Sequence, residues 1–534
     1  MPLDVQRLSK AVFYATVVIL IAYQIGYLFL MNPVMQGFEP DNYEYFNLVQ
    51  LMWQQHALSV SNPYLVFPSS GFFENPGLFV LPYLAHSFIA LQGIMVLMLY
   101  LLVFLVSKKI LDNTTLPSQY HYLAYSIILL NPTLMQQTQL LEWRGTIFAT
   151  LLQLLILYIL ALAFGQGNRK RMLGASVLAT GLVAFGMWMW SGGIILLASL
   201  ALIPLFLLMR RFKGDFDSYR IIAIACVMFG IALMFATSFF VAEFTGVLHV
   251  MSLAVNSVFQ RAVNYNSPVF GQLACYNPLQ IAELGCMTPA QGLVVGSEFI
   301  FLGLLAWLLL ARGSMAYDKS KYQLLIIGML FLSLADVPIS MIYLRMVQML
   351  APFVAIAVGI GTLVLIFRLP ASRGIVLIVL AGLLLSQMAG FVSTASSDYG
   401  IYLADNPPQL IGMANFTSAQ YANSTLLTFM GWGDYMEYAG HVRSYSDTIQ
   451  ELNYSFTLKE NTDFLLNSTP EACAYLASLH NGVDLILVSN TLGEYVTYAN
   501  ASADSVVRNP LSLEQCGYSV LRQDSGFYLL GRES

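Results

Sequence analysis

The chain is dominated by apolar segments of about 20 residues, a length that crosses the hydrocarbon core of a membrane as an α-helix. These segments fill the sequence up to about residue 393 and are separated mostly by short, often basic loops. With 57% hydrophobic and 10% charged residues, the composition excludes an ordinary soluble globular protein. We predict roughly eleven spans, at 11–31, 77–106, 120–136, 146–165, 173–190, 192–209, 221–241, 292–311, 322–340, 344–367 and 374–393.

Basic residues indicate the orientation of these spans. With the N-terminus in the cytoplasm, the cytoplasmic loops hold every Lys and Arg before residue 394 except Arg144, Arg261 and Arg345. Such loops normally carry this excess of positive charge. We therefore expect an integral protein of the inner or plasma membrane, with a cytoplasmic N-terminus and residues 394–534 outside, in the periplasm or the extracellular space.

The last 140 or so residues change to a mixed, polar and turn-rich sequence. Strand-like segments lie near 425–429, 483–488 and 527–530, and the capping pattern Ser-Thr-Pro-Glu starts a predicted helix over 470–479. We predict a membrane domain, 1–393, with external loops 32–76 and 242–291, followed by an external α/β domain, 394–534. This domain holds five Asn-x-Ser/Thr sequons, at Asn415, Asn423, Asn453, Asn467 and Asn500, which are glycan acceptors or chance matches.

Four of the five cysteines fall on the predicted outer side. Cys275 and Cys286 share the long external loop, and Cys473 and Cys516 share the external domain. An oxidising compartment favours two disulfides from these pairs, and the alternative is free buried thiols.

Acidic residues at predicted outer membrane boundaries are the first candidates for chemistry. Asp41 lies in the pattern Asp-x-Tyr-x-Tyr after the first span, with Glu39 as the fallback. Glu142 lies in the second outside segment, close to Arg144, and Glu283 lies in the long loop three residues before Cys286. The alternatives are a solvated carboxylate for Asp41 or Glu283, and for Glu142 an ion pair with Arg144.

Two further outer-side segments have the chemistry of binding sites. Arg345, at the start of a span, can hold a phosphate by paired hydrogen bonds, or alternatively can reach the lipid headgroups. The segment Trp432–Met436 reads Trp-Gly-Asp-Tyr-Met. Gly431 and Gly433, on either side of Trp432, predict a sharp turn, on which an indole donor and a carboxylate acceptor would clamp a small hydroxyl-bearing group. The alternative is a purely structural aromatic turn.

These segments, in this order and on this side of the membrane, resemble the catalytic subunit of oligosaccharyltransferase in its single-chain bacterial and archaeal (PglB/AglB-like) forms, within the GT-C class. Residues 40–46 are similar to the first acidic motif of that family, 280–283 to its TIxE motif, and 432–436 to its WWDYG motif. The sequence departs from the family at Gly433, where a second Trp is usual, and at Arg144, where a second acid is usual. The family commonly has thirteen spans, so the resemblance implies a GT-C fold of about 11–13 spans.

The resemblance implies an enzyme that transfers a glycan from a polyprenyl phosphate or pyrophosphate to an acceptor protein, at the Asn of Asn-x-Ser/Thr. Asp41, Glu142 and Glu283 would be catalytic and would hold Mg²⁺ or Mn²⁺, because hard carboxylates suit these ions. Arg345 would bind the donor phosphate, and Trp432, Asp434 and Tyr435 the acceptor. The expected partners are the lipid-linked donor, the acceptor protein and membrane lipids, with no nucleic acid, and the chain is expected to work alone.

Two alternatives to this function remain open. A related GT-C enzyme would act on Ser or Thr or use a monosaccharide-lipid donor, and the missing Trp at Gly433 is compatible with that difference. A lipid flippase, a transporter or a binding scaffold would belong to a different class. A transporter is disfavoured because the spans show no obvious internal repeat and a large external domain would be unexplained.

Overall fold

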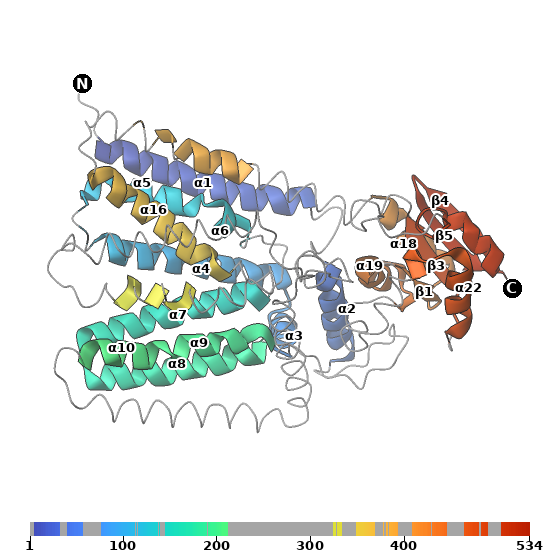
Figure 1. The fold of residues 1–534 in the computed structure, drawn as a ribbon, viewed down its shortest axis with the longest axis horizontal. Helices are drawn as coiled ribbons and strands as arrows, with labels where there is room; N and C mark the ends of the chain where they lie inside the picture. Colours follow the sequence, from blue (N-terminus) through green and yellow to red (C-terminus); the bar gives the residue numbers. More distant parts are fainter. Residues whose placement is uncertain are drawn as a thin grey trace, which may run out of the picture.

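The computed structural model contains a bundle of helices at one end and a mixed β-sheet covered by helices at the other (Figure 1). The N-terminus lies at the end of the bundle away from the sheet, and the C-terminus lies in the sheet (Figure 1). Apart from isolated positions and some helical side chains, the structure describes residues 5–31, 40–56, 76–138, 145–211, 324–333, 349–368, 378–392, 408–445, 464–479, 482–489 and 504–533.

The bundle is built mainly from long apolar helices. In the described ranges its members are α1 (Val5–Met31), α4 (Phe88–Leu111), α5 (His121–Leu129), α6 (Pro132–Gln136), α7 (Gly145–Gln166), α8 (Arg169–Met189), α10 (Leu202–Arg211) and α16 (Ala351–Arg368). Within the described residues, four helical segments are long and apolar enough to cross a membrane: Val5–Gly26, Phe88–Leu111, Gly145–Gln166 and Arg169–Met189. The predicted spans at 146–165 and 173–190 therefore correspond to α7 and α8.

Three predicted continuous spans are wrong, because the chain breaks within them. The segment 77–106 forms α3 (Pro76–Ala85) and α4, separated at His86, whose φ of 52° is left-handed. Ser87 then caps α4 by accepting a hydrogen bond from the Ala90 amide at 3.1 Å.

The other two breaks have different causes. The segment 120–136 forms η1 (Ser118–Tyr120), α5 and α6, with the interruption before Pro132, whose ring disfavours helix at the preceding residue. The segment 192–209 forms η2 (Ser191–Leu196), α9 (Leu197–Leu200) and α10. There Gly193 lies so close to the Gly186 carbonyl of α8 that a side chain would collide. Predicted spans 221–241 and 292–311 lie outside the described residues.

A five-stranded sheet with the order β2-β1-β3-β5-β4 forms the other end of the molecule. Strand β1 (Thr425–Leu427) pairs in parallel with β2 (Arg443–Ser444) and with β3 (Leu485–Ser489). Strand β5 (Phe527–Arg532) pairs antiparallel with β3 and with β4 (Tyr518–Asp524). The predicted strands near 425–429, 483–488 and 527–530 are therefore confirmed as β1, β3 and β5.

Helices cover both faces of this sheet, because its central strand is apolar on both sides. Leu485 and Leu487 of β3 pack in one core with α18 (Pro408–Gln420) and α19 (Met430–Gly440). Ile486 and Val488 pack in a second core with α22 (Thr469–Ser478) and η7 (Pro510–Cys516). This alternation is the period of two expected along a strand that is buried on both faces. The predicted capping box is confirmed at Ser468 and Glu471, at the start of α22.

Candidate functional site

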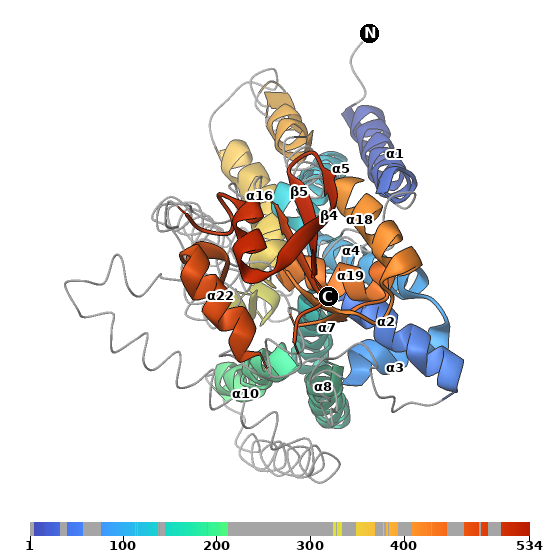
Figure 2. The same cartoon turned by 90° about the vertical axis from the view of Figure 1, so that its right-hand side faces the viewer.

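The bundle and the sheet meet where α2 (Pro40–Gln55) packs against α19 (Figure 1). Viewed from the sheet end, α2 and α19 are again neighbours (Figure 2). Asp41 is the second residue of α2, and Trp432–Met436 is part of α19. The structure thus brings together the elements that carry the predicted acidic residue and the predicted acceptor-binding residues, although these elements are far apart in the sequence.

The segment around Trp432 is a helix rather than the sharp turn that its glycines predict. It follows β1 and leads directly into the parallel neighbour β2, so β1, α19 and β2 form a parallel crossover unit. The N-terminal end of α19 consequently lies at the carboxyl ends of the parallel strands. In open sheets with parallel strands, ligands commonly bind at this edge.

Trp432 and Asp434 lie two positions apart on a helix, so their side chains point away from each other and do not face one another as a clamp in this structure. Acceptor binding by these residues remains a prediction. Trp432 and Tyr435 share the face that packs on the sheet, and each is 6% exposed. The Trp432 ring lies on that of Phe527 in β5, with 4.9 Å between centroids. Trp432 and Tyr435 therefore fix α19 on the sheet in this structure.

Asp434 belongs to a pair of buried acids on α19. Asp434 and Glu437 are three positions apart, so they lie on neighbouring faces one turn apart, and both are 0% exposed. The Ser444 amide of β2 donates a hydrogen bond to Glu437 Oε1 at 3.2 Å. Glu437 was not among the predicted site residues; its spacing of three from Asp434 identifies it only once this segment is known to be a helix.

Tyr435 sits in a less polar environment than water provides. Burial, and secondarily the neighbouring Tyr438, raises the pKa of the Tyr435 hydroxyl from 10.0 to about 12. Burial also raises the pKa of Tyr438. Both hydroxyls are therefore neutral hydrogen-bonding groups at physiological pH.

The far end of α2 is fixed against α3. The Trp53 indole donates to the Tyr83 carbonyl at 3.0 Å, and the Trp53 ring stacks on His86 with 5.6 Å between centroids. Leu48 and Met52 are buried in the main core of the bundle. Helix α2 is therefore held between α3 and α19, which gives Asp41 a defined backbone position.

A second anchored point lies at the entry to the segment that carries Glu142. Gln24 of α1 donates from Nε2 to the Thr138 carbonyl at 2.7 Å. The Tyr100 hydroxyl of α4 lies 2.9 Å from Thr138 Oγ1, which also donates to the Leu134 carbonyl at 3.1 Å. Thr138, which is 0% exposed, joins α1, α4 and the end of α6.

Several predicted site residues lie outside the described residues. They are Glu39, Glu142, Arg144, Cys275, Glu283, Cys286 and Arg345, together with the side chain of Asp41. Within the part of the chain that is described, no group of three or more His, Cys, Asp or Glu side chains could hold a metal ion. The predicted metal ligands and the phosphate-binding arginine remain predictions.

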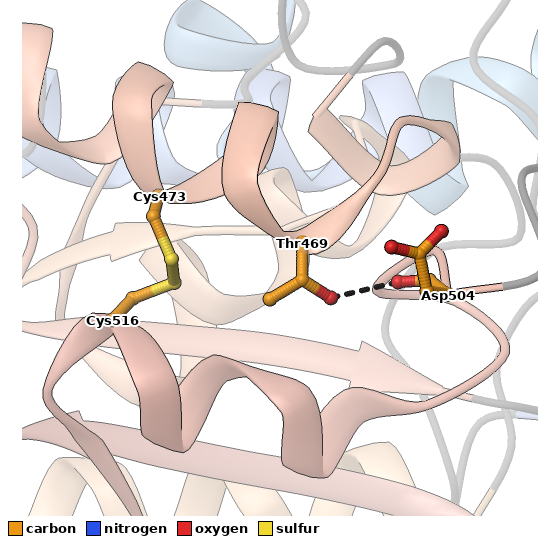
Figure 3. The surroundings of a disulfide bond; sticks show 4 residues. All are labelled: Thr469, Cys473, Asp504 and Cys516. Atoms are coloured by element: carbon orange, nitrogen blue, oxygen red, sulfur yellow. Dashed lines mark hydrogen bonds between the residues drawn. A yellow bond between two sulfur atoms is a disulfide. The ribbon is translucent and has the colours of Figure 1, made fainter.

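The expected pair Cys473 and Cys516 forms a disulfide with 5.2 Å between its Cα atoms (Figure 3). It ties α22 to the end of η7, on the face of the sheet opposite α19. In the same region, Thr469 at the start of α22 donates from Oγ1 to the Asp504 carbonyl at 2.7 Å (Figure 3). This end of α22 is thereby fixed to the loop before η7.

This architecture is similar to that of known membrane enzymes. No protein-family model and no curated protein sequence matches the chain. Among solved structures, it is similar to an oligosaccharyltransferase from Archaeoglobus fulgidus crystallised with Zn and sulfate, at 14% identity and a TM-score of 0.54, covering 98% of this chain and 73% of that one. It is also similar to ArnT from Cupriavidus metallidurans in the apo state, at 11% identity and a TM-score of 0.50, covering 96% of this chain and 97% of that one. The chain has the fold of these GT-C membrane enzymes, with an external domain after the bundle.

Proposed function

We propose that this chain, with its GT-C fold, is a membrane glycosyltransferase that moves a glycan from a polyprenyl phosphate or pyrophosphate to the Asn of a protein sequon. The observation that carries the proposal is the packing of α2, which bears Asp41, against α19, which bears Trp432–Met436. A transfer enzyme has to hold a donor and an acceptor in one place. A contact between an element of the membrane domain and an element of the external domain is suited to that task.

The chemistry requires charge stabilisation at the donor and activation of a weak nucleophile. In the proposed reaction the acceptor amide nitrogen bonds to the anomeric carbon of the sugar, the bond from that carbon to the phosphate oxygen breaks, and the amide loses a proton. Asp41 is proposed to orient the amide and accept its proton. Arg345 is proposed to pair with the negative charge on the departing phosphate.

The proposed metal site consists of Asp41, Glu142 and Glu283. This set of carboxylates fits Mg²⁺ or Mn²⁺ by its hard oxygen chemistry, and the backbone at Asp41 is placed by the anchored helix α2. A bound divalent ion would supply charge neutralisation for the leaving phosphate. The similar archaeal oligosaccharyltransferase was crystallised with Zn.

The acceptor is proposed to meet α19 at its N-terminal end. Trp432, Asp434 and Tyr435 are the proposed acceptor-site residues. All three are buried in this conformation. Trp432 and Tyr435 set the position of α19 on the sheet, so acceptor contact in this region depends on them even where they do not touch the peptide. The acceptor strand would then run along the carboxyl edge of β1, near α2.

The proposed orientation places this site on the outer side of the membrane. The start of α1 lies beside η1, where Ser9 Oγ donates to the Gln119 carbonyl at 2.6 Å, and Lys10 lies 5.6 Å from the Tyr122 ring centroid. The N-terminus lies at the end of the bundle away from the sheet (Figure 1). An excess of basic residues near this end favours the cytoplasm for it, and therefore favours the outside for α2 and α19.

A second acceptor class is favoured by one observation. Gly433 occupies the position of the second Trp in the WWDYG motif, and the first Trp, Trp432, packs on Phe527. An acceptor surface with one indole fewer is compatible with a Ser or Thr acceptor or a monosaccharide-lipid donor. The fold similarity to ArnT over 97% of that chain is compatible with this broader GT-C range.

The test is transfer by the purified chain alone. Detergent-purified protein is incubated with Mn²⁺ or Mg²⁺, a pool of polyprenyl-linked sugars, and peptides that contain Asn-Ala-Thr, Gln-Ala-Thr or Ser/Thr-rich sequences. Mass spectrometry of a glycan on Asn of the first peptide alone supports the sequon acceptor, and a glycan on Ser or Thr supports the second class. Absence of transfer to every peptide, with lipid-linked sugar translocated by the same chain in vesicles, contradicts the enzyme and supports a flippase.

A further inference from the structure

The sequons of the external domain show a repeated structural pattern. Three of them lie in the described residues, and in each the asparagine is exposed: Asn415, Asn423 and Asn467. The threonine two positions later is buried in each, with exposed fractions of 0% for Thr417, 4% for Thr425 and 3% for Thr469.

Each buried threonine hydroxyl also has a hydrogen-bond acceptor inside the fold. Thr417 Oγ1 donates to the Met413 carbonyl at 2.8 Å. Thr425 Oγ1 donates to Asp484 Oδ2 at 2.8 Å. Thr469 Oγ1 donates to the Asp504 carbonyl at 2.7 Å (Figure 3). None of these three hydroxyls is available to another protein while the domain is folded.

Local structure explains why the asparagine of each sequon is exposed while its threonine is buried. Asn415 and Thr417 lie in α18, where residues two apart point in directions about 200° apart. Asn423 has a left-handed φ of 68° in the turn before β1, and Thr425 begins that strand. Asn467 precedes the cap of α22, and Thr469 is the first residue of that helix.

An enzyme that selects Ser or Thr at the third position of a sequon has to contact its hydroxyl. A site built to hydrogen-bond a hydroxyl discriminates strongly against acceptors that cannot present it. We propose that Asn415, Asn423 and Asn467 are glycan acceptor positions that can be filled only before the external domain folds. The folded domain tolerates a glycan on each exposed asparagine but hides the hydroxyl needed to attach it.

This inference rests on one part of the proposed function, the placement of the external domain in a compartment in which sequons are glycosylated. It goes beyond that function, because it makes the external domain a substrate during biogenesis and a non-substrate afterwards. An enzyme that presents an acceptor-binding region beside its own sequons would thus avoid modifying its folded copies. After folding, attachment would require local unfolding of α18, β1 or the start of α22.

The experiment uses an independent oligosaccharyltransferase of established sequon specificity with its own lipid-linked donor, so the result does not depend on catalysis by this chain. The acceptors are the folded full-length protein, carrying a flexible Asn-Ala-Thr tag after Ser534, and a protease digest of the same protein. Mass spectrometry follows glycan attachment at the tag and at the three asparagines. The tag shows that the enzyme reaches the folded sample in detergent.

We expect the tag to be modified in the folded protein and the three asparagines to be modified in the digest. In the folded protein the three asparagines should be modified more than about 100-fold more slowly than in the digest, because only the locally opened population reacts. Comparable rates in both samples would overturn the inference. A second measurement is glycan occupancy after synthesis in a cell that glycosylates during translocation. Occupancy of at least one of the three sites is expected there, and three empty sites beside an occupied tag would also overturn it.

Failure of this inference and failure of the proposed function give different results. If the chain itself transfers no glycan but its sequons follow the expected pattern, the proposed function fails and the shielding of the sequons stands. If the chain transfers glycans but its folded sequons are modified as fast as those of the digest, the proposed function stands and the shielding of the sequons fails.

Discussion

Trp432 of α19 lies against Phe527 of β5, with 4.9 Å between ring centroids and 6% and 3% of the two residues exposed. This contact fixes α19 on the sheet, and α19 in turn packs on α2 of the membrane domain. The position of the proposed acceptor helix relative to Asp41 therefore depends on a packed aromatic pair.

Trp432→Ala should destabilise the external domain by about 3–5 kcal/mol, because it leaves a large cavity beside Phe527. Thermal unfolding of the purified protein measures the loss. Trp432→Phe, which keeps an aromatic ring at this position, is the matched control and should lose much less. An unchanged unfolding temperature for Trp432→Ala would contradict the role of this pair.

The Cys473–Cys516 disulfide should stabilise the external domain by about 2–4 kcal/mol, because it closes a loop with a sequence separation of 43 residues. The double variant Cys473→Ser/Cys516→Ser should have a lower unfolding temperature than the wild-type protein when no reductant is present. Cys226→Ser is the matched control, since that cysteine lies outside the external domain. Equal unfolding temperatures for the double variant and the wild-type protein would show that the bond contributes nothing.

Tyr435 should make the external domain less stable at alkaline pH. Its hydroxyl ionises near pH 10.0 when unfolded, but burial raises its pKa to about 12 in the folded protein. Between these values the unfolded state binds fewer protons than the folded state, so the free energy of unfolding falls as the pH rises. Tyr435→Phe should reduce that fall between pH 9 and 11.5, measured by thermal unfolding at each pH. Tyr14→Phe, at an exposed position on α1, should follow the wild-type curve.

Thr138 should stabilise the join between α1, α4 and α6. Thr138→Val keeps the shape of the side chain but removes its hydrogen bonds to Tyr100 and to the Leu134 carbonyl, at a cost of about 1 kcal/mol. Thr150→Val is the matched control, because Thr150 Oγ1 donates to the Thr146 carbonyl of its own helix rather than to another helix of the described part of the chain. Thermal unfolding that is lowered equally by both variants would remove any special role for Thr138.

Much of the fold could be predicted because its physical signals are local. The apolar length of α7 and α8, the alternating burial of β3, and the capping box at Ser468 and Glu471 are each contained within a short stretch of sequence. The Cys473–Cys516 pairing followed from the predicted compartment. These features do not depend on which distant segment packs against them.

The breaks in the predicted spans could not be predicted in the same way. The left-handed His86 and the close approach of Gly193 to α8 depend on tertiary packing, whereas the hydropathy across 77–106 and 192–209 stays high. The break before Pro132 had a sequence signal in the proline itself.

The candidate site was predictable in its residue types but not in its geometry. Gly431 and Gly433 favoured a turn at Trp432, but the parallel pairing of β1 with β2 requires a crossover, and α19 provides it. That helix separates Trp432 from Asp434 and brings Glu437 close to Asp434. The packing of α19 on α2 involves residues distant in the sequence, so no local pattern could reveal it.

The catalytic role of Asp41 is tested by glycan transfer by Asp41→Asn, compared with Asp524→Asn, a matched change at the end of β4. Asp41→Asn should keep its fold and lower the transfer rate by at least about 100-fold, because acceptor activation and metal binding lose a carboxylate. Asp524→Asn should transfer at the wild-type rate. Transfer by Asp41→Asn at the wild-type rate, with the same metal and lipid-linked donor, would rule out the catalytic role of Asp41.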